Sequence, residues 1–265
     1  MRSNKRKRFS MDRRALILAA AEREGRVRVE ALAAQFGVSP HTIRRDINAL
    51  CEASKLRRLH GGAAFVRADA NIPYGARAVL NLEAKRLIAR RVADLIPDRA
   101  TVFLSVGTTP ALVAAALAER TGLTVVTNNL SAAIALADDP GQRILLPGGE
   151  LRLPDRDLLG EAAIALFEAH RADFGIYGAG GIDRDGALLD FSVEEVRTRE
   201  TIRANSRCAV FVADRSKFGR IAPAVGGALR EASVVAIDRR PELDYARLLD
   251  ALSGELIVAA EREAA

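Results

Sequence analysis

Aromatic residues, cysteines and histidines are scarce in this chain of 265 residues, and each scarcity argues against a class of function. Tryptophan is absent and aromatic side chains make up 5% of the chain, which argues against a surface that stacks single-stranded bases. The two cysteines, Cys51 and Cys208, lie far apart, and no histidine, cysteine or acidic cluster has zinc-ligand spacing. We therefore expect no metal site and two reduced thiols.

Long apolar runs are also missing. No stretch approaches the roughly 18 apolar residues that a membrane-spanning helix requires, and no signal-peptide pattern opens the chain. These absences predict a cytoplasmic protein that does not bind membranes.

Motifs of nucleotide and histidine chemistry are lacking as well. The sequence has no GxxxxGK[ST] loop, and the string GAGGID at 178–183 lacks the spacing of a dinucleotide-binding fold. His41 and His60 lie in a basic N-terminal segment, and His170 is expected at a helix end, so a histidine general base is not expected in the rest of the chain. We predict no cofactor and no catalytic residues.

Charge is divided unevenly along the chain. Residues 1–67 contain 16 Lys and Arg against 6 Asp and Glu, whereas the remainder contains 24 against 28. A basic head on a mildly acidic body is typical of a nucleic-acid-binding module joined to a domain with another task.

The basic head has the order of elements of a winged helix-turn-helix. Taken in order, the expected elements are a helix at 15–22, an extended segment at 27–29, a helix at 30–36, a glycine turn, a third helix from Pro40 and a basic hairpin around Gly61. Ser39 can cap the third helix, while Ile43, Ile47 and Leu50 recur at helical spacing and form its buried stripe.

The opposite side of the third helix is therefore expected to enter the major groove of DNA. Arg44 lies nearer the edge of this side, where it suits a backbone phosphate, and two glycines let the hairpin turn approach the phosphate chain. The candidate DNA contacts are Ser39, His41, Thr42, Arg44, Arg45, Asn48, Arg57, Arg58, His60, Gly61 and Gly62.

The remainder of the chain predicts an α/β domain. Residues 1–65 are assigned to the DNA-binding domain, 66–81 to a linker and 82–265 to this second domain. Its expected strands are 101–105, 123–127, 143–146, 174–177, 208–213, 234–237 and 256–258; its expected helices are 83–95, 110–119, 130–137, 160–169, 193–205 and 245–252. Such alternation indicates a mostly parallel sheet, which binds ligands at the carboxyl ends of its strands.

Polar and glycine-rich loops follow five of these strands. The loop GTTP at 107–110 opens a helix and suits a phosphate, and Lys217 can supply a compensating charge. Because these loops share one sheet edge, we expect them to form a small-molecule site. The candidates are Ser105, Gly107, Thr108, Thr109, Thr127, Asn128, Asn129, Gly148, Gly149, Glu150, Arg152, Gly178, Gly180 and Lys217.

Several strings in both halves carry a resemblance to a known family. VSPHTIRRDINAL with RRLHGGA, and then VGTTP, VVTNNLSAA, LPGGELR, EVRT and SKFGR, resemble the DeoR family of bacterial repressors over about residues 10–228. The resemblance implies a sensor domain related to sugar-phosphate isomerases and repression relieved by a phosphorylated three-carbon effector, glycerol 3-phosphate. It adds Glu194 and Arg197 to the effector-binding candidates.

One position departs from the family pattern. Two residues before the glycine of GTT the family usually has an aspartate, and this chain has Ser105. A serine accepts hydrogen bonds from ligand hydroxyls less strongly and without charge, which bears on effector affinity and identity.

We therefore predict a repressor that binds double-stranded operator DNA as a homodimer or homotetramer and is released by the effector. The alternative is a sugar-phosphate isomerase-like enzyme with an added DNA-binding head, for which Glu150, Glu194 and Asp214 remain as carboxylate bases. A protein that binds nucleic acid through charge alone is a third reading, and it leaves the second domain unexplained.

Overall fold

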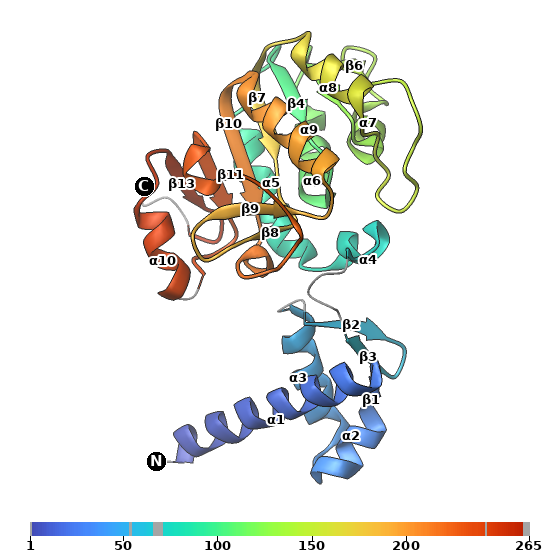
Figure 1. Ribbon diagram of the computed structural model, residues 1–265, viewed down its shortest axis with the longest axis vertical. Helices are drawn as coiled ribbons and strands as arrows, with labels where there is room; N and C mark the ends of the chain where they lie inside the picture. The colour runs from blue at the N-terminus through green and yellow to red at the C-terminus, as the bar shows by residue number, and fades with distance from the viewer. Residues whose placement is uncertain (1, 53–54, 66–70, 242, 262–265) are drawn as a thin grey trace. The chain divides into compact units, whose positions relative to one another are not determined.

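The computed structural model describes residues 2–52, 55–65, 71–241 and 243–261, and it divides the chain into two units. Residues 1–72 form one unit and residues 73–265 the other. The smaller unit consists of α1 (Arg2–Glu24), β1 (Arg26–Arg28), α2 (Val29–Phe36), α3 (Pro40–Glu52), β2 (Leu56–Leu59) and β3 (Gly62–Phe65). This order confirms the expected winged helix-turn-helix (Figure 1).

The smaller unit is built around one apolar cluster that includes Ile17 of α1, Leu32 of α2 and Ile43 and Ile47 of α3. The strands form an antiparallel sheet in the order β1-β3-β2, with β2 and β3 as the predicted hairpin. Helix α1 begins far earlier than the expected helix at 15–22, because no glycine or proline interrupts Arg2–Glu24.

The larger unit has a seven-stranded parallel sheet in the order β13-β12-β10-β7-β4-β5-β6. The strands are β4 (Thr101–Leu104), β5 (Thr124–Thr127), β6 (Arg143–Leu145), β7 (Ala172–Tyr177), β10 (Ser206–Ala213), β12 (Val234–Ile237) and β13 (Glu255–Val258). All seven lie at the predicted places, and all pair in parallel, so the mostly parallel α/β prediction is confirmed.

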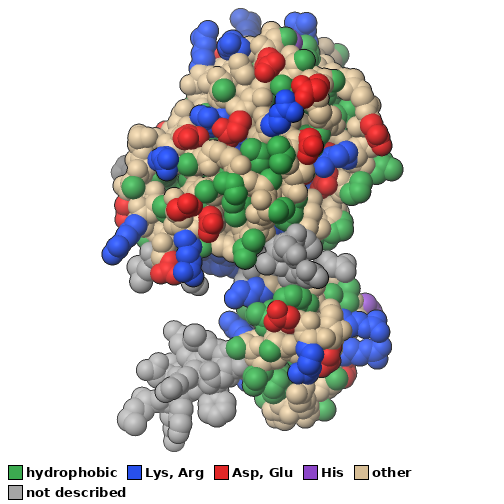
Figure 2. Space-filling model, in the orientation of Figure 1, with side chains coloured by type: hydrophobic (Ala, Val, Ile, Leu, Met, Phe, Trp, Pro, Cys, Tyr) green, Lys and Arg blue, Asp and Glu red, His purple; other side chains and the backbone are tan. Residues whose placement is uncertain are grey.

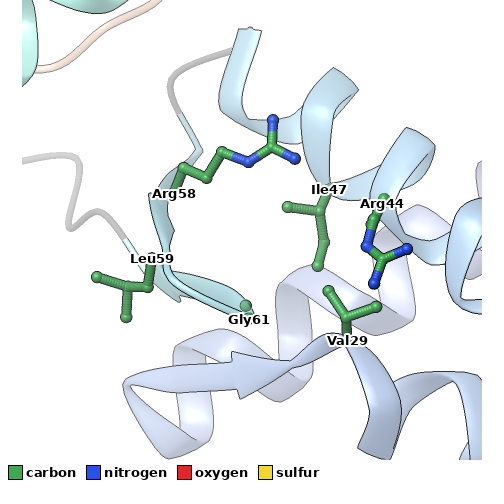
Figure 3. Close-up of a pocket in the computed structure, with 7 residues that line it drawn as sticks. Val29, Arg44, Ile47, Arg58, Leu59 and Gly61 are labelled. Atoms are coloured by element: carbon green, nitrogen blue, oxygen red, sulfur yellow. The ribbon is translucent and has the colours of Figure 1, made fainter.

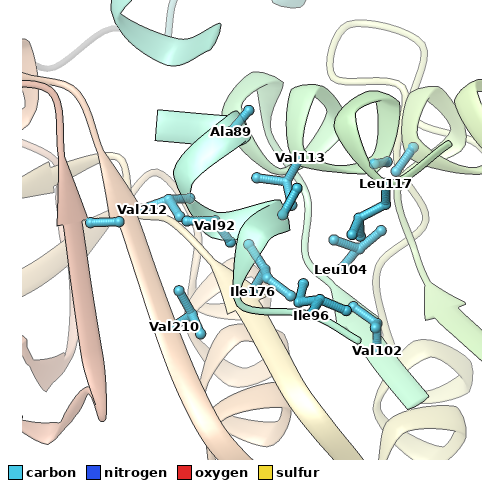
Figure 4. Packing of buried hydrophobic residues seen from close by; sticks show 14 of the residues in the cluster. Ala89, Val92, Ile96, Val102, Leu104, Val113, Leu117, Ile176, Val210 and Val212 are labelled. Carbon is cyan, nitrogen blue, oxygen red and sulfur yellow. The ribbon is translucent and has the colours of Figure 1, made fainter. Parts of the chain in front are cut away.

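Helices cover both faces of this sheet. Alternate residues of β4 separate into two apolar clusters, with Val102 and Leu104 in one and Phe103 in the other. The first cluster contains residues of α5 (Leu82–Asp94), α6 (Thr108–Ala116) and α7 (Leu130–Leu136), and Figure 4 shows part of it. The second contains residues of α8 (Glu161–Glu168), α9 (Val193–Ala204) and α10 (Leu243–Asp250). Short 3-10 turns are η1 (Leu117–Glu119), η2 (Arg215–Lys217) and η3 (Leu229–Glu231).

Two features of the larger unit differ from the sequence expectation. A small antiparallel sheet, β11-β9-β8, is formed by β8 (Gly181–Ile182), β9 (Ala187–Asp190) and β11 (Ala224–Ala228). The segment expected as a linker at 66–81 includes helix α4 (Tyr74–Val79), which belongs to this unit. Tyr74 is buried and its amide donates to the carbonyl of Pro154, and Arg77 pairs with Asp155; residues 66–70 lie outside the described residues.

Candidate functional sites

Helix α3 presents a polar side to solvent, as predicted. Ser39 caps the helix, since its Oγ accepts from the amide of Thr42 at 3.3 Å and lies 3.0 Å from Thr42 Oγ1. His41, Arg44 and Arg45 are exposed, and they stand opposite the buried Ile43 and Ile47. A capped helix with three exposed donors at its N-terminal half has the chemistry that reads base edges in a major groove.

Helix α3 is held on α1 by a buried ion pair that the sequence analysis did not identify. Asp46 is fully buried, and Arg13 and Arg14 donate to its two carboxylate oxygens at 2.6 and 3.2 Å. The two arginines lie 33 and 32 positions from Asp46, so helical periodicity alone could not reveal the contact. Asp46 adjoins Arg45, so the ion pair ties α1 to the helix that carries the predicted DNA contacts.

The hairpin and α3 together form a small pocket (Figure 3). Its volume is about 60 Å³, and Arg44 from α3 and Arg58 from β2 both line it, beside the turn at Gly61. Gly61 has a φ of 74°, which suits a glycine at this turn. Two arginines at a pocket of this size suit one backbone phosphate. Figure 2 shows Lys and Arg side chains of this unit interspersed with hydrophobic and acidic ones on the visible face.

Two predicted DNA contacts are placed differently. Gly62 is buried, and a Cβ there would lie 2.0 Å from the carbonyl oxygen of Val27, so this glycine permits close packing of β3 on β1. Asn48 is half-buried, and its Oδ1 is shielded from solvent without a hydrogen-bond partner among the described residues. His60 and Arg58 are exposed as expected, and the side chain of Arg57 lies outside the described part of the chain.

The strand-end loops of the larger unit meet at one edge, because every strand of the sheet runs in the same direction. Asn129 joins two of them: its Nδ2 donates to the carbonyls of Ser105 at 3.1 Å and Gly107 at 2.9 Å, and its Oδ1 caps α7. Thr127 donates to the carbonyl of Leu104 at 2.7 Å. These two side chains therefore hold the loops in place, and their hydrogen-bonding groups are largely occupied within the protein.

The loop after β4 keeps the features of an anion site. Gly107 precedes α6 with a φ of 113°, and Thr108 and Thr109 are buried in the first turn of the helix. The first amides of a helix lack intrahelical partners and carry its positive end. Asn128, next to Asn129 in the sequence, is also buried. Its Nδ2 donates to the carbonyl of Leu158, and its Oδ1 has no hydrogen-bond partner among the described residues.

Other predicted effector contacts are distributed around this edge. Gly148, Gly149 and Glu150 after β6 are exposed, as is Glu194. Arg152 bonds Asp157 at 2.7 Å and Glu195 at 3.1 Å, which ties the β6 loop to α9. Arg197 forms an exposed pair with Glu161 at 2.8 Å, and the Gly180 amide donates to Asp190 at 2.8 Å. Gly178 lies beside β10, where a Cβ would stand 3.2 Å from the carbonyl oxygen of Val212.

A group of cations near Lys217 was not predicted apart from Lys217 itself. Arg77 on α4, Lys85 on α5 and Arg220 after η2 all interact electrostatically with Lys217. Lys217, Lys85 and Arg220 also interact with Asp214, whereas Arg77 pairs with Asp155. Burial and the neighbouring Arg220 lower the pKa of Lys217 to about 7, and burial lowers the pKa of Lys85 to about 8 against the pull of Asp214. Burial alone would raise the pKa of Asp214, but Lys217 and Lys85 hold it below its usual value.

Both units of the chain match models of known protein domains. Residues 13–68 match a model of the DeoR-like helix-turn-helix domain, and residues 80–239 match a model of the DeoR C-terminal sensor domain. The chain belongs to the DeoR family. A chain of this family is a DNA-binding transcription regulator, and the comparisons support this function over that of an enzyme.

Curated relatives cover most of the chain. It is 43% identical over 233 residues to the glycerol-3-phosphate regulon repressor of Escherichia coli (strain K12), covering 88% of this chain and 92% of that protein. It is 35% identical over 226 residues to the HTH-type transcriptional repressor CsqR of the same organism, covering 85% and 86%. Among solved structures, a ribose 5-phosphate isomerase from Plasmodium falciparum aligns with a TM-score of 0.36 and 13% identity over 51% of this chain and 52% of that one.

Membrane-spanning helices and metal-binding clusters are both absent from the described residues. No helix among them is long and apolar enough to cross a membrane. They contain no group of three or more His, Cys, Asp or Glu side chains placed to hold a metal ion.

Proposed function

We propose that this protein is a cytoplasmic repressor that binds operator DNA and releases it when glycerol 3-phosphate binds. The effector would bind at the strand-end edge, with its phosphate on the first turn of α6 and its hydroxyls near Ser105 and Asn128. The observation that supports this most is the placement of buried Thr108 and Thr109 at a positive helix end on that edge. The name of the Escherichia coli relative supports the choice of glycerol 3-phosphate.

Release would follow from unequal binding of the effector to two arrangements of the protein. An effector that favours the non-binding arrangement by about 1–3 kcal/mol weakens operator affinity about 5- to 150-fold. Specific binding also calls for two DNA-binding heads on one face of the duplex, so we propose a homodimer or a homotetramer. Analytical ultracentrifugation with and without operator would reveal a monomer if this assembly is wrong.

The test uses an operator selected from random duplex DNA by repeated rounds of binding. Fluorescence anisotropy then follows release of that operator as glycerol 3-phosphate is added, with glycerol and glucose 6-phosphate as controls. We expect release by glycerol 3-phosphate and none by glycerol. Thr108→Val and Lys217→Ala should bind the operator yet resist release; a normal response by both variants would show that the effector binds elsewhere.

A further inference from the structure

Helix α4 opens the larger unit, and a loop from a distant part of the chain holds it there. The helix begins at Tyr74, and the chain on its N-terminal side leads to the DNA-binding unit. The Tyr74 amide donates to the carbonyl of Pro154 at 3.1 Å, and Arg77 forms an ion pair with Asp155. The two members of this ion pair lie 78 positions apart in the sequence, so the loop after β6 fixes the start of the larger unit.

The ring of Tyr74 lies at the centre of this contact. Tyr74 is 6% exposed, and the guanidinium groups of Arg77 and Arg156 lie 5.8 and 5.0 Å from the centroid of its ring. The side chains of Arg77 and Asp155 are 16% and 13% exposed. Breaking an ion pair that is shielded from water costs more than breaking one on the surface. We call the contacts of Tyr74 and Arg77 with residues 154–156 the α4 dock.

Arg156 also belongs to the edge of the sheet where the effector is proposed to bind. Its carbonyl accepts from the amide of Leu130, the first residue of α7, at 3.0 Å. Two residues further on, the Leu158 amide donates to the carbonyl of Asn128 at 2.9 Å, and the Leu158 carbonyl accepts from Asn128 Nδ2 at 2.9 Å. The loop that holds α4 is therefore bonded directly to a predicted effector contact.

The backbone of Arg156 is held in an uncommon conformation. Its φ is 58°, in the left-handed region that residues other than glycine seldom adopt. Such a conformation persists where surrounding contacts hold it, and here those contacts come from Leu130 and from Tyr74. Loss of either contact allows Arg156 to relax, which gives the loop two distinct arrangements.

On the basis of the proposed function, we propose that docking of α4 is the switch between operator binding and release. The docked form, which is the ligand-free structure, binds the operator. The effector binds beside Asn128, where one of its hydroxyls displaces the Leu158 carbonyl from Asn128 Nδ2 and shifts residues 156–158. This shift opens the α4 dock and frees the chain that leads to the DNA-binding unit. The effector thus binds the undocked form more tightly than the docked form.

Tyr74, Asp155 and Arg156 are positioning residues in this scheme, because they act through α4. The apparent affinity of a ligand falls in proportion to the populated fraction of the form that binds it. While the docked form predominates, a variant that raises the undocked fraction tightens effector binding by the same factor. A purely structural role predicts weaker or unchanged effector binding, so the sign of the change separates a switch from a structural contact.

Isothermal titration calorimetry of the full-length protein with glycerol 3-phosphate measures this sign. Asp155→Asn keeps the shape of the side chain and removes the charge that pairs with Arg77, and it should tighten binding at least about fivefold. Arg156 is exposed, so Arg156→Met leaves the buried core unchanged. A cation–π contact at an exposed site is worth a factor of about two to five, and we expect Arg156→Met to tighten binding by that factor. Arg156→Lys, which keeps a cation, should lie closer to the wild type.

Release of the operator, followed by fluorescence anisotropy, should change in the same proportion. Asp155→Asn should release the operator at a glycerol 3-phosphate concentration lower by the factor that calorimetry gives. The matched control is Asp250→Asn, whose pair with Arg240 spans 3.5 Å between side chains that are 69% and 51% exposed. This control should bind the effector and release the operator as the wild type does. Unchanged or weaker effector binding by both Asp155→Asn and Arg156→Met overturns the inference and leaves the proposed effector intact.

Hydrogen exchange followed by mass spectrometry tests the α4 dock without relying on the effector. In a peptide that covers residues 73–80 of the wild type, operator DNA should slow exchange and glycerol 3-phosphate should speed it. Unchanged exchange with both ligands bound overturns the inference. If glycerol 3-phosphate does not bind the wild type, the proposed effector is refuted and the operator measurement decides alone: slower exchange supports the dock as the DNA-binding arrangement, and unchanged exchange overturns it.

Discussion

Replacing Asp46 with asparagine should loosen the packing of α1 on α3 while leaving the shape of the side chain unchanged. Asp46 is fully buried, and its carboxylate accepts from Arg13 and Arg14. Removing one partner of a buried pair commonly costs about 3–5 kcal/mol. Here the arginines are 15% and 37% exposed and regain water, so we expect a smaller loss of about 2–3 kcal/mol.

Hydrogen exchange followed by mass spectrometry measures this loss locally, because exchange of core amides requires opening of the helices. A loss of 2–3 kcal/mol corresponds to exchange about 30- to 150-fold faster in peptides from α1 and α3. The control is Glu30→Gln, whose pair with Arg44 spans 3.7 Å between side chains that are 67% and 52% exposed. Such a surface pair contributes at most about 1 kcal/mol.

The reasoning fails if Asp46→Asn exchanges no faster than Glu30→Gln. That result would mean that the apolar contacts of Ile17 with α3 hold the helices together by themselves. Peptides from the larger unit serve as an internal reference, and their exchange should be the same in all three proteins.

Three further predictions concern the predicted DNA contacts, the α6 loop and Lys217. Arg45→Ala should weaken binding to the selected operator by about 1–3 kcal/mol, measured by anisotropy, with little change in binding to random DNA. Equal losses on both DNAs would make Arg45 a phosphate contact. Arg58→Ala should weaken binding to both DNAs equally and reduce the slope of log affinity against log salt by about one. Gly107→Ala should destabilise the larger unit by about 1–3 kcal/mol in thermal unfolding, because φ is 113° there; an unchanged melting temperature would show that the loop adapts. Lys217→Met should raise the melting temperature of the ligand-free protein more at pH 6 than at pH 9.5. The pKa of Lys217 in the folded protein, about 7, lies below its value in the unfolded chain, so the wild type gains stability as the pH rises above 7. An equal rise in melting temperature at both pH values would contradict this.

The sheet was predictable because its strands are buried on both faces. Such strands appear in the sequence as short continuous apolar runs. For Val234–Ile237 the predicted and observed bounds of the strand are identical. The small antiparallel sheet was missed because β8 has two residues and β11 contains adjacent glycines, which leave no period to detect. Local patterns identify elements that are long or wholly buried, and they fail where pairing is set by distant segments.

The same limit explains which site residues were found. Ser39 and Gly107 were identified because capping and turn chemistry depend on adjacent residues. Asp46 and Lys85 each look like part of a solvated helix surface, and only tertiary contacts show them to be buried. Arg77 lay in a stretch that composition assigned to the linker, so the group of cations near Lys217 could not be assembled from the sequence.

The surroundings of three carboxylates bear on the alternative of an isomerase-like enzyme. A base that removes a proton from carbon must lie in the pocket with a free oxygen and a raised pKa. Glu150 and Glu194 are exposed, and the pKa of Glu194 is lowered by backbone hydrogen bonding. Asp214 is buried, hydrogen-bonded to Asn81 and held ionised by Lys217 and Lys85. Glu194 and Asp214 thus lack the raised pKa of such a base, and position 105 is a serine, which agrees with the function of the family as DNA-binding transcription regulators.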